Sequence, residues 1–344
     1  MRRLGAILVV SLACAACGGE DDSTGTTAEP EASESPNNGA GTPSRDDVVA
    51  TIVADVIVPG YVRMDAATAA LRTAIDDLCA QPADAQLATA QQAWREARQA
   101  WSATRAYRLG PATDRRSMSK IDFTIDPAKI IDLLAGTDPV DVTAIGSLGS
   151  DQRGLGGIEL ALFGSAPVDP RACEYAASAS ELVAAAATAL ADDWAAGVEM
   201  GTQVVIEDLV NGVVFALADV ADMRLGPASG STTGRAAPAE IDAGPAQSAL
   251  DDMVAVLDSV DAVVGGLEPL VSEQSVETTD RLATQLDKAR TNIGLIPAPL
   301  ATTTDEDAMT NAYRSTTAAL LLARTEVASL LGVTLTLGDA DGDS

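Results

Sequence analysis

Arg108-Leu109-Gly110-Pro111-Ala112 recurs about 116 residues later as Arg224-Leu225-Gly226-Pro227-Ala228, each time at the end of a stretch with helical spacing of apolar residues. Farther along, Ile121-Asp122 recurs as Ile241-Asp242, at an offset of about 120 residues. Short matches in the same order at similar offsets indicate an internal duplication. We therefore expect two related units, with the boundary in or near an alanine-rich helix around residues 192–202.

Apolar residues in the rest of the chain recur at spacings of three and four, as in the stretches 71–78 and 250–257. Beta-branched alternation is scarce, so this pattern predicts helices. Prolines and glycines interrupt the pattern at intervals that leave segments of bundle length. We expect an all-α fold of helix bundles, the first over residues 46–195 and the second over residues 196–344.

Residues 1–17 have the pattern of a lipoprotein signal peptide. Arg2 and Arg3 form a positive n-region, a short apolar run follows, and small residues precede Cys17. The run is too short to span a bilayer as a permanent helix. We expect Cys17 to carry the lipid; Cys14 is the alternative, with a poorer lipobox before it. The mature protein would then be exported and anchored to the cell envelope, in the periplasm or on the outer face of a membrane.

The segment 18–45 is rich in Ser, Thr, Gly, Pro and acidic residues and lacks any large apolar residue. Such a segment cannot bury enough surface to offset its conformational entropy. We expect a flexible linker between the lipid anchor and the folded region.

The charge balance is strongly acidic, with 22 Lys and Arg against 50 Asp and Glu and a net charge of −28. Phosphate backbones are repelled by such a surface, so we expect no nucleic-acid partner. An acidic surface can attract cations and basic partners. It also keeps proteins soluble, and this is the interpretation that we favour.

The chain contains no histidine. This excludes nucleophile activation by Ser-His-Asp or Cys-His arrangements, and it excludes the histidine zinc site of the usual metalloproteases. Carboxylate oxygens remain as metal ligands, and these suit hard cations.

Glu159 is the single carboxylate in the apolar, glycine-bounded stretch 154–164. An ionised group in such surroundings is costly unless something pairs with it. Glu159 is therefore the first candidate for a functional group. The alternative is a capping or core-edge glutamate that accepts hydrogen bonds from backbone amides.

Trp94, Arg98, Trp101 and Arg105 are spaced by four, three and four residues on the stretch before the first Gly-Pro break. On one helix they would share a face, and the guanidinium groups could lie against the indole rings in a binding cleft. The alternative, which we favour, is a packing face whose rings are covered by the aliphatic stems of the arginines.

Cys79 and Cys173 are the cysteines left once the signal peptide is set aside. An exported compartment permits them to pair, and we expect a disulfide within the first bundle. Two buried thiols are the alternative, because the sequence does not show how closely their α-carbons approach.

Together these residues resemble the imelysin family over nearly the whole chain from about residue 48 onward. The blocks that carry the resemblance, in the family's usual order, are residues 59–61, 93–101, 108–111, 121–123, 154–164 and 331–335, followed by the acidic stretch 339–343. The resemblance implies an exported, often lipid-anchored protein made of two duplicated four-helix bundles. It also implies an association with iron acquisition, in some members as part of a ferrous-iron uptake system.

The imelysin signature is Gly-x-His-x-x-Glu, and its His and Glu are proposed to hold a metal. Gly154 and Glu159 match its ends, but Gly156 stands at the histidine position. The resemblance implies that Glu159 faces the groove between the bundles. Asp122 and its counterpart Asp242 would be its neighbours, and these three carboxylates would hold iron or another divalent cation as cofactor.

The residues and the resemblance together predict a non-enzymatic binding component in iron or metal acquisition, which uses the cleft between the bundles. Its partners would be the membrane, through the lipid anchor, and iron-uptake proteins. One alternative is an imelysin-type metallopeptidase, which we disfavour because one Glu cannot readily serve as both metal ligand and base. Another is a degenerate scaffold that keeps the fold without a ligand.

Overall fold

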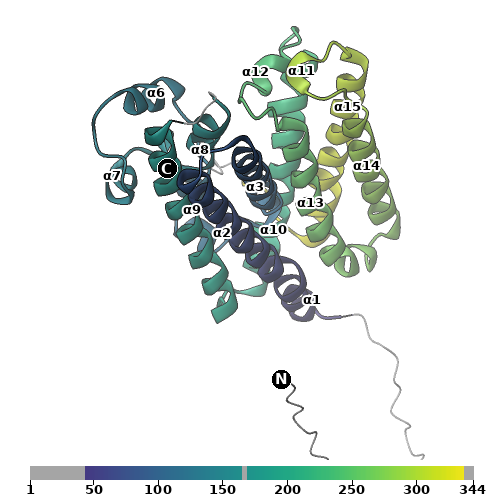
Figure 1. The fold of residues 1–344 in the computed structure, drawn as a ribbon. Coiled ribbons are helices and arrows are strands. Elements are labelled where there is room, and N and C mark those ends of the chain that lie inside the picture. Colours follow the sequence, from purple (N-terminus) through teal and green to yellow (C-terminus); the bar gives the residue numbers. More distant parts are fainter. Residues whose placement is uncertain (1–42, 165–168, 337–344) are drawn as a thin grey trace, which may run out of the picture. The chain divides into compact units, whose positions relative to one another are not determined.

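The computed structural model describes residues 43–164 and 169–336, and Figure 1 shows their arrangement. These residues form helices and no strand, which confirms the all-α prediction. The signal peptide, Cys17 and most of the predicted linker lie outside the described residues. Helix α1 (Arg45–Ile52) begins within the last residues of that linker, where Ser44 caps it in a capping box with Asp47. Among the described helices, none is long and apolar enough to cross a membrane.

The first bundle is a ring of four helices. Its members are α2 (Val58–Ala80), α3 (Asp84–Ser102), α8 (Gly154–Phe163) and α9 (Pro170–Ala196). Helix α2 packs against α3 and α9, and α8 packs against the same two helices. The π-helical turn Val53–Ile57 joins α1 to α2. Between α3 and α8 the chain forms the 3-10 turn Arg105–Tyr107 and the short helices α4 (Pro111–Asp114), α5 (Ser117–Ile121), α6 (Pro127–Ala135) and α7 (Val142–Ser147), followed by the 3-10 turn Ser150–Gln152.

The second bundle is a ring of the same kind. Its members are α10 (Thr202–Ala218), α13 (Ala249–Ser272), α14 (Val276–Gly294) and α15 (Glu306–Leu322). Helix α10 packs against α13 and α15, and α14 packs against the same two. The remaining elements are the π-helical turns Asp219–Leu225 and Ala323–Val327, the 3-10 turn Leu300–Thr302, and the short helices α11 (Gly226–Ser229), α12 (Pro238–Ile241) and α16 (Ala328–Leu331). The change between bundles falls in residues 197–201, a loop rather than a helix.

The repeated motifs relate the helices of one ring to those of the other, with an offset in chain order. Residues 108–112 follow α3, the second helix of the first ring, whereas residues 224–228 follow α10, the first helix of the second. Asp122 and Asp242 each directly follow a short helix, α5 or α12, ahead of the next long member of the ring. The motifs therefore match α3 to α10 and α8 to α13. The second helix of the first ring corresponds to the first helix of the second ring, an offset of one helix in chain order.

The two bundles meet along α3, the turn Arg105–Tyr107, α10 and α13. Close approach is possible there because residue 212, on α10, is a glycine. A Cβ at Gly212 would overlap the carbonyl oxygen of Ala106. Ser259 of α13 adds a hydrogen bond across the same contact, since its hydroxyl accepts from the backbone N–H of Ala106 at 3.1 Å. The contact region carries the candidate site.

Cys79, near the end of α2, forms a disulfide with Cys173, in the first turns of α9. Their α-carbons lie 5.6 Å apart, within the range that a disulfide accepts. The bond joins two neighbouring helices of the first bundle across 94 residues of sequence.

Candidate functional site

The predicted stripe of aromatic and basic residues divides into groups with different roles. Trp94 and Trp101 are buried core residues of α3, and the indole N–H of Trp94 donates to the carbonyl of Leu155 at 2.9 Å. Arg105 lies beyond the end of α3, in the following 3-10 turn, so it does not share the face. The packing-face interpretation therefore describes the two tryptophans.

Contacts between guanidinium groups and aromatic rings are present, but other arginines make them. Arg108 places its guanidinium 3.5 Å from the centroid of the Trp101 ring. Arg95 lies over Phe163 at 4.7 Å. The helical spacing predicted these contacts for Arg98 and Arg105. Arg98 instead forms ion pairs with Asp122 and Asp252, and Arg105 lies in a 3-10 turn, where side chains follow a different spacing.

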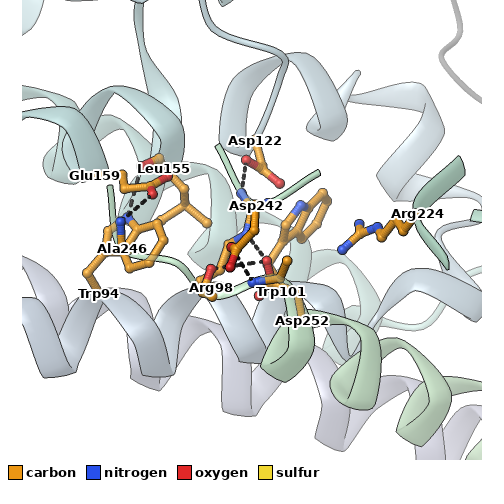
Figure 2. Close-up of polar contacts among 12 residues, drawn as sticks. Trp94, Arg98, Trp101, Asp122, Leu155, Glu159, Arg224, Asp242, Ala246 and Asp252 are labelled. Atoms are coloured by element: carbon orange, nitrogen blue, oxygen red, sulfur yellow. Dashed lines mark hydrogen bonds and ion pairs between the residues drawn. The ribbon is translucent and has the colours of Figure 1, made fainter. Parts of the chain in front are cut away.

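Arg98 lies at the centre of an ionic cluster between the bundles (Figure 2). It pairs with Asp122, at the end of α5, and its Nε donates to Asp252 of α13 at 3.0 Å. The Asp252 side chain is only 4% exposed, and its Oδ1 has no hydrogen-bond partner among the described residues. Burial alone would lower the pKa of Arg98, but the charges of Asp122 and Asp252 outweigh burial and raise it.

Glu159, on α8, completes this cluster and reaches the second bundle. Its Oε1 accepts the backbone N–H of Ala246 at 2.9 Å, as Figure 2 shows. Gly244, in the same loop of residues 243–248, passes so close that a Cβ there would overlap the carboxylate. Burial raises the pKa of Glu159; the Ala246 hydrogen bond and Arg98 oppose that rise, while Asp252 and Asp122 add to it.

Asp242 has a structural role in the second bundle. It is 5% exposed, its Oδ1 accepts the N–H of Ala249 at the start of α13 at 3.1 Å, and its Oδ2 accepts the N–H of Ala301 at 3.3 Å. These bonds satisfy backbone amides at a helix start and at the Leu300–Thr302 turn.

A cleft of about 640 Å³ opens beside the ionic cluster. Residues 101–119 form one wall, and residues 198–200 with α10 form the other. Trp101 and Arg105, from the predicted stripe, line this cleft. Trp94 and Arg98, from the same stripe, and Gly156 of the signature are not among its lining residues.

The sequence model of the imelysin family matches residues 57–331. The chain belongs to the imelysin family. Its fold resembles that of an imelysin-like protein from Psychrobacter arcticum 273-4, with a TM-score of 0.75 and 18% identity over 86% of this chain and 98% of that one.

A second solved structure is a protein from Parabacteroides distasonis ATCC 8503, provisionally named as an iron-regulated protein A precursor. It matches with a TM-score of 0.68 and 18% identity over 85% of this chain and 96% of that chain. No curated protein matches the sequence significantly.

The histidine position of the imelysin signature has no room for a side chain in this protein. A Cβ at Gly156 would lie 2.8 Å from Cγ2 of Ile125. Ile125 is β-branched, so its Cγ2 cannot move away without a change at χ1. Gly156 therefore stands where the signature has histidine, and Ile125 occupies the space that a side chain there would need.

The carboxylates predicted as metal ligands do not fit a metal ion as the structure places them. Asp122 is paired with Arg98, Asp242 is held by two backbone amides, and Glu159 accepts from Ala246. In the part of the chain that the structure describes, no group of three or more His, Cys, Asp or Glu side chains could hold a metal ion. The predicted set fails because its members already have protein partners on different elements.

Two residues of this region were missed by sequence reasoning. Asp252 is one of 50 acidic residues, and nothing in its neighbourhood shows that α13 brings it to Arg98. Arg108 belongs to the repeated motif, and its place three residues after Arg105 is a weak signal of a basic turn.

We expect Glu159→Gln to change how stability depends on pH. The pKa of the folded carboxyl is raised above the ordinary value of 4.5, so the folded protein retains the proton in a window where the unfolded chain has lost it. As pH rises from about 4.5 through the raised pKa, the wild type therefore loses stability relative to the variant. The amide side chain of the variant keeps an oxygen that can accept from Ala246.

Urea unfolding at closely spaced pH values would measure this difference. The other carboxylates titrate in both proteins and cancel to first order. A stability difference that stays constant across the whole window would show that Glu159 is not held in the environment described.

Proposed function

We propose that this protein is an exported, lipid-anchored and non-enzymatic binding protein with a role in iron acquisition, and that it holds its ligand in the cleft between the two bundles. The observation that carries the proposal is the cleft of about 640 Å³. Pockets of this size suit a small molecule or a metal complex. The anchor at Cys17 and a partnership with iron-uptake proteins at the membrane belong to the same proposal.

Family and relatives support the iron-related part. The chain belongs to the imelysin family, and a protein of the same fold carries a name that refers to regulation by iron. The leader pattern of residues 1–17 supports export and lipid anchoring.

Hydrolysis is less well supported than binding. A metallopeptidase needs an ion with an open position and a base that activates water. Gly156 supplies no ligand, Ile125 fills the space of one, and Glu159 is bonded to Ala246. These contacts argue against both the metal and the base of the proposed imelysin peptidase.

Equilibrium dialysis of the mature chain in detergent against radioactive iron tests the proposal. Iron would be offered as ferrous ion, as ferric ion and as ferric citrate, to the wild type, Thr113→Trp and Glu159→Gln. Thr113 is an exposed residue that lines the cleft, so a tryptophan there would fill it. We expect saturable retention of one iron form by the wild type and Glu159→Gln, and its loss in Thr113→Trp.

The other outcomes separate the alternatives. If Glu159→Gln no longer retained iron while Thr113→Trp still did, the iron site would lie at the signature glutamate and not in the cleft. Retention of no iron form would contradict the proposal and favour a scaffold without ligand. Cleavage of peptides by the wild type would favour the hydrolase.

A further inference from the structure

The interior of the cleft is basic, although the chain as a whole is strongly acidic. Arg105 and Arg108 both come from the segment 101–119 and line the cleft. The Arg105 side chain is 16% exposed, and Arg108 is partly buried against the face of Trp101. Two guanidinium groups are thus withdrawn from bulk solvent on one wall.

Arg108 has no acidic partner among the described residues. Its Nε donates to Thr104 Oγ1 at 3.1 Å, its Nη2 to the carbonyl of Trp101 at 2.6 Å, and its Nη1 to the sulfur of Met118 at 2.8 Å. All three acceptors are neutral, and a guanidinium has five N–H donors. Two N–H donors are left without an acceptor among the described residues, and the charge is offset only at longer range by Asp122 and Asp219.

Arg105 is equally short of partners. Among the described residues its one ion pair is with Asp219, at 3.9 Å, and Arg224 shares that carboxylate at the shorter distance of 3.0 Å. No hydrogen bond from Arg105 is present within the described ranges. Burial, and after it the charge of Arg105, lower the pKa of Arg108 to about 9, although Tyr61, Asp122 and Asp219 oppose the shift. An anion placed here would further stabilise the charged guanidinium.

The acidic residues that line the cleft form no ion pair with Arg105 or Arg108 in the part of the chain that the structure describes. Asp114 and Glu199 are exposed, whereas Asp208 on α10 is partly buried. Burial, followed by the charge of Glu207, raises the pKa of Asp208. Asp208 makes no ion pair or hydrogen bond with any described residue, so it is not a direct partner of Arg105 or Arg108.

A third arginine lines the same wall, but it is exposed, as Asp114 and Glu199 are. Arg116 lines the cleft with a backbone φ of 51°, in the left-handed region that favours glycine. An arginine kept in that conformation carries a backbone cost that the surrounding structure must offset. The indole N–H of Trp101 is buried and has no acceptor among the described residues.

We propose that the cleft binds a small organic polycarboxylate, either free or as the anionic chelate of a metal ion, through Arg105 and Arg108. Guanidinium groups match carboxylates in a planar, two-point geometry, and the Trp101 ring fixes the orientation of Arg108. Binding of the metal chelate rests on the proposed function in iron acquisition. Binding of the free polycarboxylate does not.

Calorimetric titration of the mature chain with iron-free citrate tests the inference directly. We expect saturable binding that weakens as NaCl is added, because salt screens the attraction between the open cleft and the approaching anion. Arg105→Gln should weaken binding about tenfold or more, which is the scale of one hydrogen bond to a charged group. Asp219 keeps Arg224 in this variant, so the fold should be retained.

The control is Arg115→Gln, because Arg115 is exposed, pairs with Asp193 and does not line the cleft. It should bind citrate as the wild type does. Arg108→Lys keeps the charge but loses the planar fork, and it should also weaken binding; circular dichroism would check that it folds.

Two further titrations decide the ligand class. Inorganic phosphate that binds as tightly as citrate would overturn the polycarboxylate assignment in favour of a general oxyanion site. No citrate binding, or equal binding by the wild type and Arg105→Gln, would overturn the inference. Iron retention without citrate binding would support the proposed function and overturn the polycarboxylate inference. Citrate binding without retention of any iron form would support the inference and contradict the proposed function.

Discussion

Arg98→Met is expected to lower the free energy of unfolding by about 3 kcal/mol, the lower end of the range for breaking a buried ion pair. The variant leaves Asp252 and Asp122 without their cation. Asp252 is the costlier of the two, because its side chain is 4% exposed and its Oδ1 has no hydrogen-bond partner among the described residues. The lower end applies because Arg98 and Asp122 stay about one-fifth exposed.

A matched control separates burial from simple loss of an ion pair. Arg72 of α2 pairs with Glu181 of α9 at 3.0 Å, but both side chains are more than 40% exposed. Arg72→Met should therefore cost less than about 1 kcal/mol. Adding Asp252→Asn to Arg98→Met should recover part of the loss, because it removes the unpaired buried charge. Equal losses for Arg98→Met and Arg72→Met in urea unfolding would contradict the cluster as described.

Removing the disulfide is expected to have an effect of similar or larger size. Replacing Cys79 and Cys173 together by serine should cost about 2–5 kcal/mol, because the bond closes a long loop of 94 residues in the unfolded chain. Urea unfolding of the double variant measures this cost. Reduction of the wild type with dithiothreitol should bring its midpoint to that of the variant. A change below about 1 kcal/mol on both routes would mean that the bond adds little to the first bundle.

Helix content and bundle organisation could be predicted because they depend on short-range patterns. Spacing of apolar residues by three and four reports the buried face of a helix wherever that helix packs. The repeat of residues 108–112 at 224–228 indicated that related segments occur twice. The chain passes from one bundle to the other in the loop 197–201, directly after α9.

Arg105 shows why the site was harder to predict. Counting by helical spacing put it on one face with Arg98, but α3 ends at Ser102 and the chain turns. Arg105 therefore faces the cleft beside Arg108, while Arg98 reaches Asp122 and Asp252. A helix boundary moved by a few residues changes the direction of every side chain beyond it.

The sequence by itself determined that this protein is helical, that it lacks histidine and that Gly156 breaks the imelysin signature. These properties are fixed by residue identity and local spacing. Only the tertiary structure decided that Glu159 bonds to Ala246, that Asp242 caps α13 and that Arg105 and Arg108 share a cleft. The physical reason is that pairing energies depend on distance and burial between side chains far apart in sequence, and those are set only when the two bundles pack.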